Sequence, residues 1–96
     1  MMVTILGKRW RFRFTPFKAP KGKSPHHGEC DNPEKKRKEI RINSELRNRE
    51  RLEAILHELF HATEWEMLSE LWVEQAAFDI SKILWKLNYK SPDDDD

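Results

Sequence analysis

The chain has 96 residues, which is the size of one domain with a single small core. Its formal net charge is +1 with 36% charged residues, so bulk charge does not indicate a nucleic-acid-binding protein. The single cysteine, Cys30, excludes an internal disulfide and is typical of a reducing compartment. Basic residues interrupt the first apolar stretch, and no apolar run reaches the ~20 residues of a membrane span. We therefore expect a cytoplasmic protein without a membrane partner.

The first half of the chain predicts strands. Residues 3–6 form a short apolar run, and Gly7 with Lys8 predicts a turn or a bulge. Residues 9–14 alternate strictly between arginine and aromatic side chains, which places the aromatic rings on one face of a strand. The opposite face carries Arg9, Arg11 and Arg13. We interpret it as the solvated face of a half-covered antiparallel sheet, with a weak nucleic-acid contact as the alternative.

Two further strands are expected before the helices begin. The stretch 26–33 contains a short strand at its centre, closed by an Asn-Pro turn. The basic run 35–38 is interpreted as a solvated hairpin connection, with phosphate binding as the alternative. Residues 39–42 alternate again, so Ile40 and Ile42 are expected to point inward from a strand.

The second half predicts two helices and a tail. The first should run from about residue 48 to about residue 65, after a turn that residues 43–44 can cap, with Asn48 as a second candidate cap. The second should run from about 70 to 87, with Ser69 as N-cap and Glu70 in the first turn. We expect an α+β fold in which a small antiparallel sheet of about three strands packs on both helices. Residues 1–91 would form this domain, and 92–96 an acidic disordered tail.

The first helix contains the motif H-E-x-x-H at residues 57–61. Residues four apart share one helix face, so His57 and His61 offer two imidazole nitrogens to one point, which is half of a tetrahedral zinc site. Glu58 projects beside that point, where a general base for a zinc-activated water stands. The alternative is an amphipathic helix with two surface histidines. The apolar face of this helix argues against that alternative, because it contains neither histidine. The members of this apolar arc are Leu52, Ile55, Leu56, Leu59 and Thr63.

A catalytic zinc site usually has three protein ligands, so a third ligand is expected from the second helix. Glu74 and Glu70 lie four apart there and point roughly the same way. Glu70 has a structural explanation as a first-turn acid. Glu74 lies past capping range among apolar residues, where a carboxylate requires a partner, so we favour Glu74 with Glu70 as the alternative. His26, His27 and Asp79 stay open as minor candidates.

The motif, the short link and the following acidic helix together resemble the gluzincin metallopeptidases. The short length is similar to SprT-like and ImmA/IrrE-like domains and to the small metallopeptidases of phages and prophages. The stretches that echo the phage group are 28–33, 38–42 and 52–62, followed by 72–85. The resemblance implies a zincin-like fold whose sheet packs on the active-site helix and whose edge strand binds substrate in extended form. That edge would be strand 9–14 or strand 39–42.

These observations predict a Zn²⁺-dependent peptidase acting on a peptide or protein substrate, with His57, His61 and Glu74 as ligands and Glu58 as general base. The first alternative is a non-catalytic module with a closed structural metal site, for which Cys30, Glu70 or His27 would supply a fourth ligand. The second is a nucleic-acid-associated protein of phage or prophage origin that uses the arginine face and the basic run.

Overall fold

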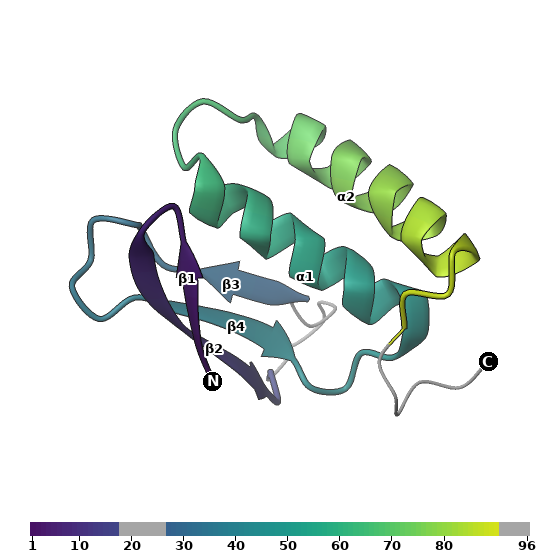
Figure 1. The fold of residues 1–96 in the computed structure, drawn as a ribbon, viewed down its shortest axis with the longest axis horizontal. Helices are drawn as coiled ribbons and strands as arrows, with labels where there is room; N and C mark the ends of the chain where they lie inside the picture. Colours follow the sequence, from purple (N-terminus) through teal and green to yellow (C-terminus); the bar gives the residue numbers. More distant parts are fainter. Residues whose placement is uncertain (18–26, 91–96) are drawn as a thin grey trace, which may run out of the picture.

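A computed structural model describes residues 1–17 and 27–90 of the chain (Figure 1). The predicted acidic tail 92–96 and the minor candidate His26 lie outside this part. Strands occupy the first half and helices the second, as the sequence patterns predict. The elements in order are β1 (Met2–Ile5), β2 (Lys8–Thr15), β3 (Gly28–Cys30), β4 (Glu39–Asn43), α1 (Asn48–Thr63) and α2 (Glu70–Lys86).

The four strands form one mixed sheet in the order β1-β2-β4-β3. β1 and β2 form an antiparallel hairpin whose two loop residues, Leu6 and Gly7, have φ of 50° and 77°. Positive φ at both positions is characteristic of a type I′ turn, so the expected turn at Gly7 is confirmed. β2 pairs with β4 in parallel, opposing Phe12 and Ile40, and β3 pairs antiparallel with β4.

The α+β class is confirmed, but the expected sheet of about three antiparallel strands is wrong in two respects. A fourth strand, β1, comes from the N-terminal apolar run, and the β2–β4 pair is parallel. The expectation for the edge strand is also wrong, because strands 9–14 and 39–42 became the two interior strands. The edges are β1 and β3. The sequence patterns identify the strands but carry no information about their order.

The molecule has three layers rather than a sheet covered by both helices (Figure 1). α1 packs on β3 and β4, and α2 packs on α1. The core between the sheet and α1 is built on Trp10 and Phe12 of β2 and on Ile40 and Ile42 of β4, closed by Ala54 and Ala62 of α1. Arg9, Arg11 and Arg13 stay exposed on the outer face of the sheet, as expected for a half-covered sheet.

The face of α1 that is most buried differs from the predicted arc. Its buried residues are Ala54, Glu58 and Ala62, whereas Thr63 is exposed. The difference arises because α1 lies between two neighbours, so its apolar residues are shared between two contact faces. Small alanine side chains allow close approach to the sheet. Glu58 is therefore placed inside the layer between α1 and β3.

The two helices begin differently. At α2, the Ser69 hydroxyl accepts a hydrogen bond from the Trp72 N–H at 3.1 Å, which confirms the predicted N-cap. At α1 the N-cap is Arg47 and makes no side-chain cap, so the expected cap at Asn48 is wrong. Asn48 is instead the first helical residue, while Asn43 accepts from the Glu45 N–H in the preceding turn. Neither helix of the described chain is long and apolar enough to cross a membrane.

Candidate metal centre

His57 and His61 meet as their spacing predicts. Their Nε2 atoms lie 3.3 Å apart, and their rings are 5.0 Å apart between centroids. Both side chains are largely buried in the junction between α1 and the start of α2, with 21% and 16% of their area exposed. The ring of Trp65 stands edge-on to His61, with 6.2 Å between centroids. The pair is thus held in one orientation by its surroundings.

Glu70 is the acid that reaches the histidines. Its Oε1 lies 2.8 Å from His57 Nε2 and its Oε2 lies 3.0 Å from His61 Nε2. Within residues 1–17 and 27–90, this trio is the only histidine, cysteine, aspartate or glutamate group close enough to hold a metal ion. Glu74 lies one turn further along α2, lines the same cleft, and is exposed. Glu74 is therefore not a buried carboxylate that requires a partner, as the sequence had suggested, and the geometry favours Glu70 as the third donor.

The donor set fits zinc in chemistry and in spacing. Two imidazole nitrogens and one carboxylate make up a familiar catalytic zinc set. Ligands about 2.0–2.1 Å from a tetrahedral zinc are about 3.3–3.4 Å from one another. The separation of 3.3 Å between the two histidine nitrogens matches this value. The separations of 2.8 and 3.0 Å between the histidine nitrogens and the Glu70 carboxylate are those of direct hydrogen bonds. Because the Glu70 side chain is 60% exposed, it can exchange these hydrogen bonds for a bond to a metal.

Glu58 occupies the position next to the trio, between α1 and the edge strand β3. It is 7% exposed, and no described residue forms a hydrogen bond or an ion pair with its carboxylate. Burial raises the pKa of Glu58 to about 7, and the carboxylates of Glu70 and Glu29 add to the rise while Arg41 opposes it. A carboxyl group with a pKa near neutrality can both accept and donate a proton, as a general base requires.

Gly28 provides the space that Glu58 occupies. A Cβ at Gly28 would lie 2.9 Å from Glu58 Cγ and 3.1 Å from Glu58 Oε2, closer than side chains approach. Gly28 faces α1 because it pairs with Ile42, whose side chain is in the core. Sequence reasoning missed this contact.

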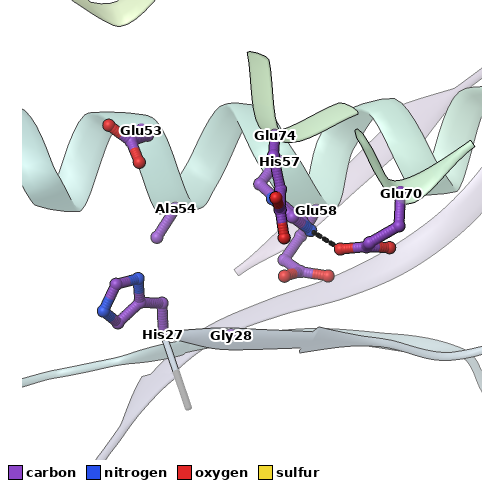
Figure 2. A pocket seen from close by; sticks show the side chains of 8 residues that line it. All are labelled: His27, Gly28, Glu53, Ala54, His57, Glu58, Glu70 and Glu74. Carbon is purple, nitrogen blue, oxygen red and sulfur yellow. Dashed lines mark ion pairs between the residues drawn. The ribbon is translucent and has the colours of Figure 1, made fainter. Parts of the chain in front are cut away.

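A cleft of about 470 Å³ opens beside the trio, between α1, α2 and the start of β3 (Figure 2). His57, Glu58, Glu70 and Glu74 line one part of it. The lining is completed by His27, Gly28, Glu53 and Ala54. In Figure 2 the Glu58 carboxylate lies between the helix and the strand, close to the Glu70 end of the cleft. The metal donors and the buried acid therefore share one accessible space.

A second hollow of about 400 Å³ adjoins the same two acids on the other side, lined by Cys30, Glu58, His61, Trp65, Leu68 and Glu70. The Cys30 thiol is outside the metal-binding trio and donates to the Asp31 carbonyl at 3.4 Å. Burial raises its pKa to about 12, with Glu58 and Asp31 adding to the rise, which keeps the thiol protonated. His27 is also outside the trio. Cys30 and His27, the two other candidates for a fourth ligand, therefore lie outside the group of His57, His61 and Glu70.

A polar cluster holds the β3–β4 hairpin behind the site. Asp31 accepts from the Glu39 N–H at 2.9 Å and from Arg41 at 2.8 Å. Partial burial would raise the pKa of Asp31, but the bonds from Arg41 and Glu39 outweigh it and lower that pKa. Arg41 also pairs with Glu29 and Glu39, so the cluster fixes the strand that carries Gly28. Sequence reasoning missed this role of Asp31 and Arg41.

The arginine face is partly neutralised. Glu39 lies 3.9 Å from Arg11 and 3.8 Å from Arg13, and Glu39 also pairs with Arg41. Exposed ion pairs of this kind contribute little to stability, yet they reduce the positive charge offered to a phosphate backbone. Tyr89, the only tyrosine in the sequence, is exposed after the end of α2 and lines none of the cavities described above.

Comparison of the chain with protein-family models, curated proteins and solved structures gives no significant match.

Proposed function

We propose that the protein is a minimal zincin-like, zinc-dependent peptidase in which His57, His61 and Glu70 hold the metal. The single observation that carries the proposal is the convergence of these three donors beside a buried acid, Glu58, at an open cleft. A structural zinc site is usually closed by four protein ligands. The trio here has three donors and a space next to it, which is the arrangement of a catalytic site.

A zinc ion held by His57, His61 and Glu70 would supply activation of a water near neutral pH and polarisation of a substrate carbonyl. Glu58 takes a proton from a water in the cleft as the water oxygen bonds to the carbonyl carbon, and returns that proton to the amide nitrogen as the carbon–nitrogen bond breaks. Its pKa of about 7 suits both steps, because the same group must accept and then donate near neutral pH. Burial of Glu58 against Gly28 holds the carboxylate at the edge of the cleft.

The edge strand β3 supports an extended peptide as the substrate. Among the described strands it pairs with β4 only, so its other edge is the one at which we propose that a peptide pairs. Gly28 of this strand lines the cleft, and Cys30 lines the adjoining hollow. A peptide that adds to this edge by backbone hydrogen bonds would lie directly across Glu58 and Glu70.

The first experiment measures the zinc content of the purified protein by elemental analysis. Wild-type protein should bind about one zinc per chain, and His57→Ala and Glu70→Gln should lose it. The matched variant Glu74→Gln removes the same charge one turn away and should retain the metal. Zinc lost in Glu74→Gln but kept in Glu70→Gln would show that Glu74 is the ligand. Wild type without zinc, after zinc is offered and the excess removed, would overturn the metal site.

The second experiment measures hydrolysis of a mixed peptide library by mass spectrometry. Wild type should cleave some members, whereas Glu58→Gln should bind zinc normally and lose at least a hundredfold in rate, the contribution typical of a general base. Equal cleavage by wild type and Glu58→Gln would refute the role of Glu58. Zinc binding without any cleavage would identify a non-catalytic metal module instead.

A further inference from the structure

Two hollows flank the proposed metal centre, and the residues that line them differ in chemistry. The larger cleft lies over Gly28 and the middle of α1, and the smaller hollow lies over Cys30 and the C-terminal end of α1. Both are lined by Glu58 and Glu70, so they adjoin at the site where reaction is proposed. A chain lying along β3 would therefore place neighbouring side chains in different environments on the two sides of the reacting bond.

The larger cleft offers a free negative charge. Its acids apart from Glu58 and Glu70 are Glu53 and Glu74. Glu53 is paired with Arg49 at 2.6 Å, which largely neutralises it. Glu74 makes no ion pair or hydrogen bond with any residue of the described chain. The remaining polar side chain of the lining is the imidazole of His27.

The smaller hollow offers an apolar surface. Trp65, Leu68 and the half-buried Cys30 contribute to its lining. Trp65 is 39% exposed, and its ring makes an edge contact with the ring of His61. A rigid aromatic side chain beside an aliphatic one is a good contact for an apolar side chain of a ligand.

We infer that the substrate is an extended peptide with a lysine or arginine side chain beside Glu74 on one side of the reacting bond and an apolar side chain beside Trp65 and Leu68 on the other. The inference rests on the proposed function for the bond that reacts, and on charge and apolar complementarity for the two side chains. A buried acid without a partner, Glu58, points into the same space and marks it as a ligand site rather than a surface cluster of acids.

The test is an NMR titration of isotope-labelled wild-type protein, both metal-free and zinc-loaded, with capped tetrapeptides. The peptides carry lysine and leucine on either side of a central alanine pair, in both orders, and a second set has glutamate in place of lysine. Lysine peptides should bind about five- to tenfold more tightly than glutamate peptides at low salt, since one exposed charge pair contributes modestly. The amide signals of Glu74 and Leu68 should shift together.

Two variants make the test specific. Glu74→Lys should reverse the preference between lysine and glutamate peptides. Asp79→Lys makes the same charge change on α2 at an exposed residue that lines neither hollow, and it should leave the preference unchanged. The inference is overturned by equal binding of both peptide sets, by no binding of either, by a preference that survives Glu74→Lys, or by one that Asp79→Lys also reverses. Loss of zinc in Glu74→Gln would overturn it too.

These outcomes separate the inference from the proposed function. A lysine preference that depends on Glu74, without cleavage of any peptide, would leave the inference standing and refute the peptidase. Cleavage of peptides regardless of their charge would leave the peptidase standing and refute the inference.

Discussion

At the scale of single residues, Glu58 owes its position to a neighbour that has no side chain. A Cβ at Gly28 would meet both Glu58 and the backbone oxygen of Arg41, the latter at 3.0 Å. Since strand β4 is held by its own pairing, the Glu58 side chain is the partner that must move. Gly28 therefore acts as a positioning residue for the proposed general base.

Gly28→Ala should keep the zinc content of the wild type but lower kcat/KM at least tenfold. Overpacking should also reduce the free energy of unfolding by about 1–3 kcal/mol. Zinc analysis, hydrolysis kinetics and urea unfolding measure the three effects. The control is Cys30→Ala, which changes the same face of the same strand without adding atoms. A Gly28→Ala protein with wild-type kcat/KM would show that the contact is not needed to place Glu58.

The raised pKa of Glu58 makes the metal-free protein less stable as the pH rises. In the unfolded chain Glu58 releases its proton near its ordinary pKa of 4.5, whereas in the fold its pKa is about 7. The folded state therefore binds the extra proton between these values, and stability falls with increasing pH across that window. Below this pH window Glu58 is protonated in both the folded and the unfolded state, so the two states no longer differ in the protons that they bind.

Glu58→Gln should therefore raise the free energy of unfolding of the metal-free protein by about 3 kcal/mol at pH 8 and change it little at pH 4.5. Urea unfolding with a chelator present, at both pH values, measures the difference. The control Glu66→Gln changes an exposed acid outside the cleft and should have a small effect at either pH. An equal gain for Glu58→Gln at the two pH values would mean that the effect is not one of charge.

At the scale of elements, the first turn of α2 carries the third proposed donor. Ser69 caps this turn, and Glu70 is its first residue. Ser69→Ala should reduce the free energy of unfolding by about 1 kcal/mol, and Ser69→Asp should restore most of it. Because a frayed turn releases Glu70, zinc affinity should also fall severalfold in Ser69→Ala, measured by competition with a chelator. Unchanged affinity would indicate that Glu70 is held independently of the cap.

The sequence predicts the helices and strands better than it predicts which of their residues come into contact. Alternation along residues 9–14 and 39–42 located two strands, and the spacing of His57 and His61 brought two donors together, because both are local periodicities. The choice between Glu70 and Glu74 depends instead on how far α2 slides along α1, which the connection at residues 64–69 sets. Both acids share one face of α2, so periodicity could not separate them. The parallel β2–β4 pair was missed because alternation along a strand does not show which strand lies beside it or in which direction that strand runs.

At the scale of the whole molecule, the two helices are joined at both ends by polar contacts. Near the start of α1, Arg49 donates to the Ser81 hydroxyl of α2 at 3.0 Å and pairs with Glu53. Near its end, His57 and His61 meet Glu70. α2 contacts the rest of the fold chiefly through α1, so these contacts govern how firmly it is attached. A metal held by donors from both helices would strengthen the second contact.

Zinc should therefore stabilise the protein against unfolding. A ligand at 100 times its dissociation constant adds about 2.7 kcal/mol if it binds only the folded state. In a domain of this length each 1 kcal/mol shifts the Tm by roughly 4–8 °C, so removal of zinc by a chelator should lower the Tm by roughly 10–20 °C. Calorimetry measures this shift.

His57→Ala should show no such shift, because it lacks a donor from α1, while Glu74→Gln should respond as wild type does. Hydrogen exchange should locate the protection that zinc confers in the first turn of α2, where Glu70 lies. A stabilisation spread evenly over the sheet and both helices, or one that persists in His57→Ala, would mean that zinc binds elsewhere and does not join the two helices.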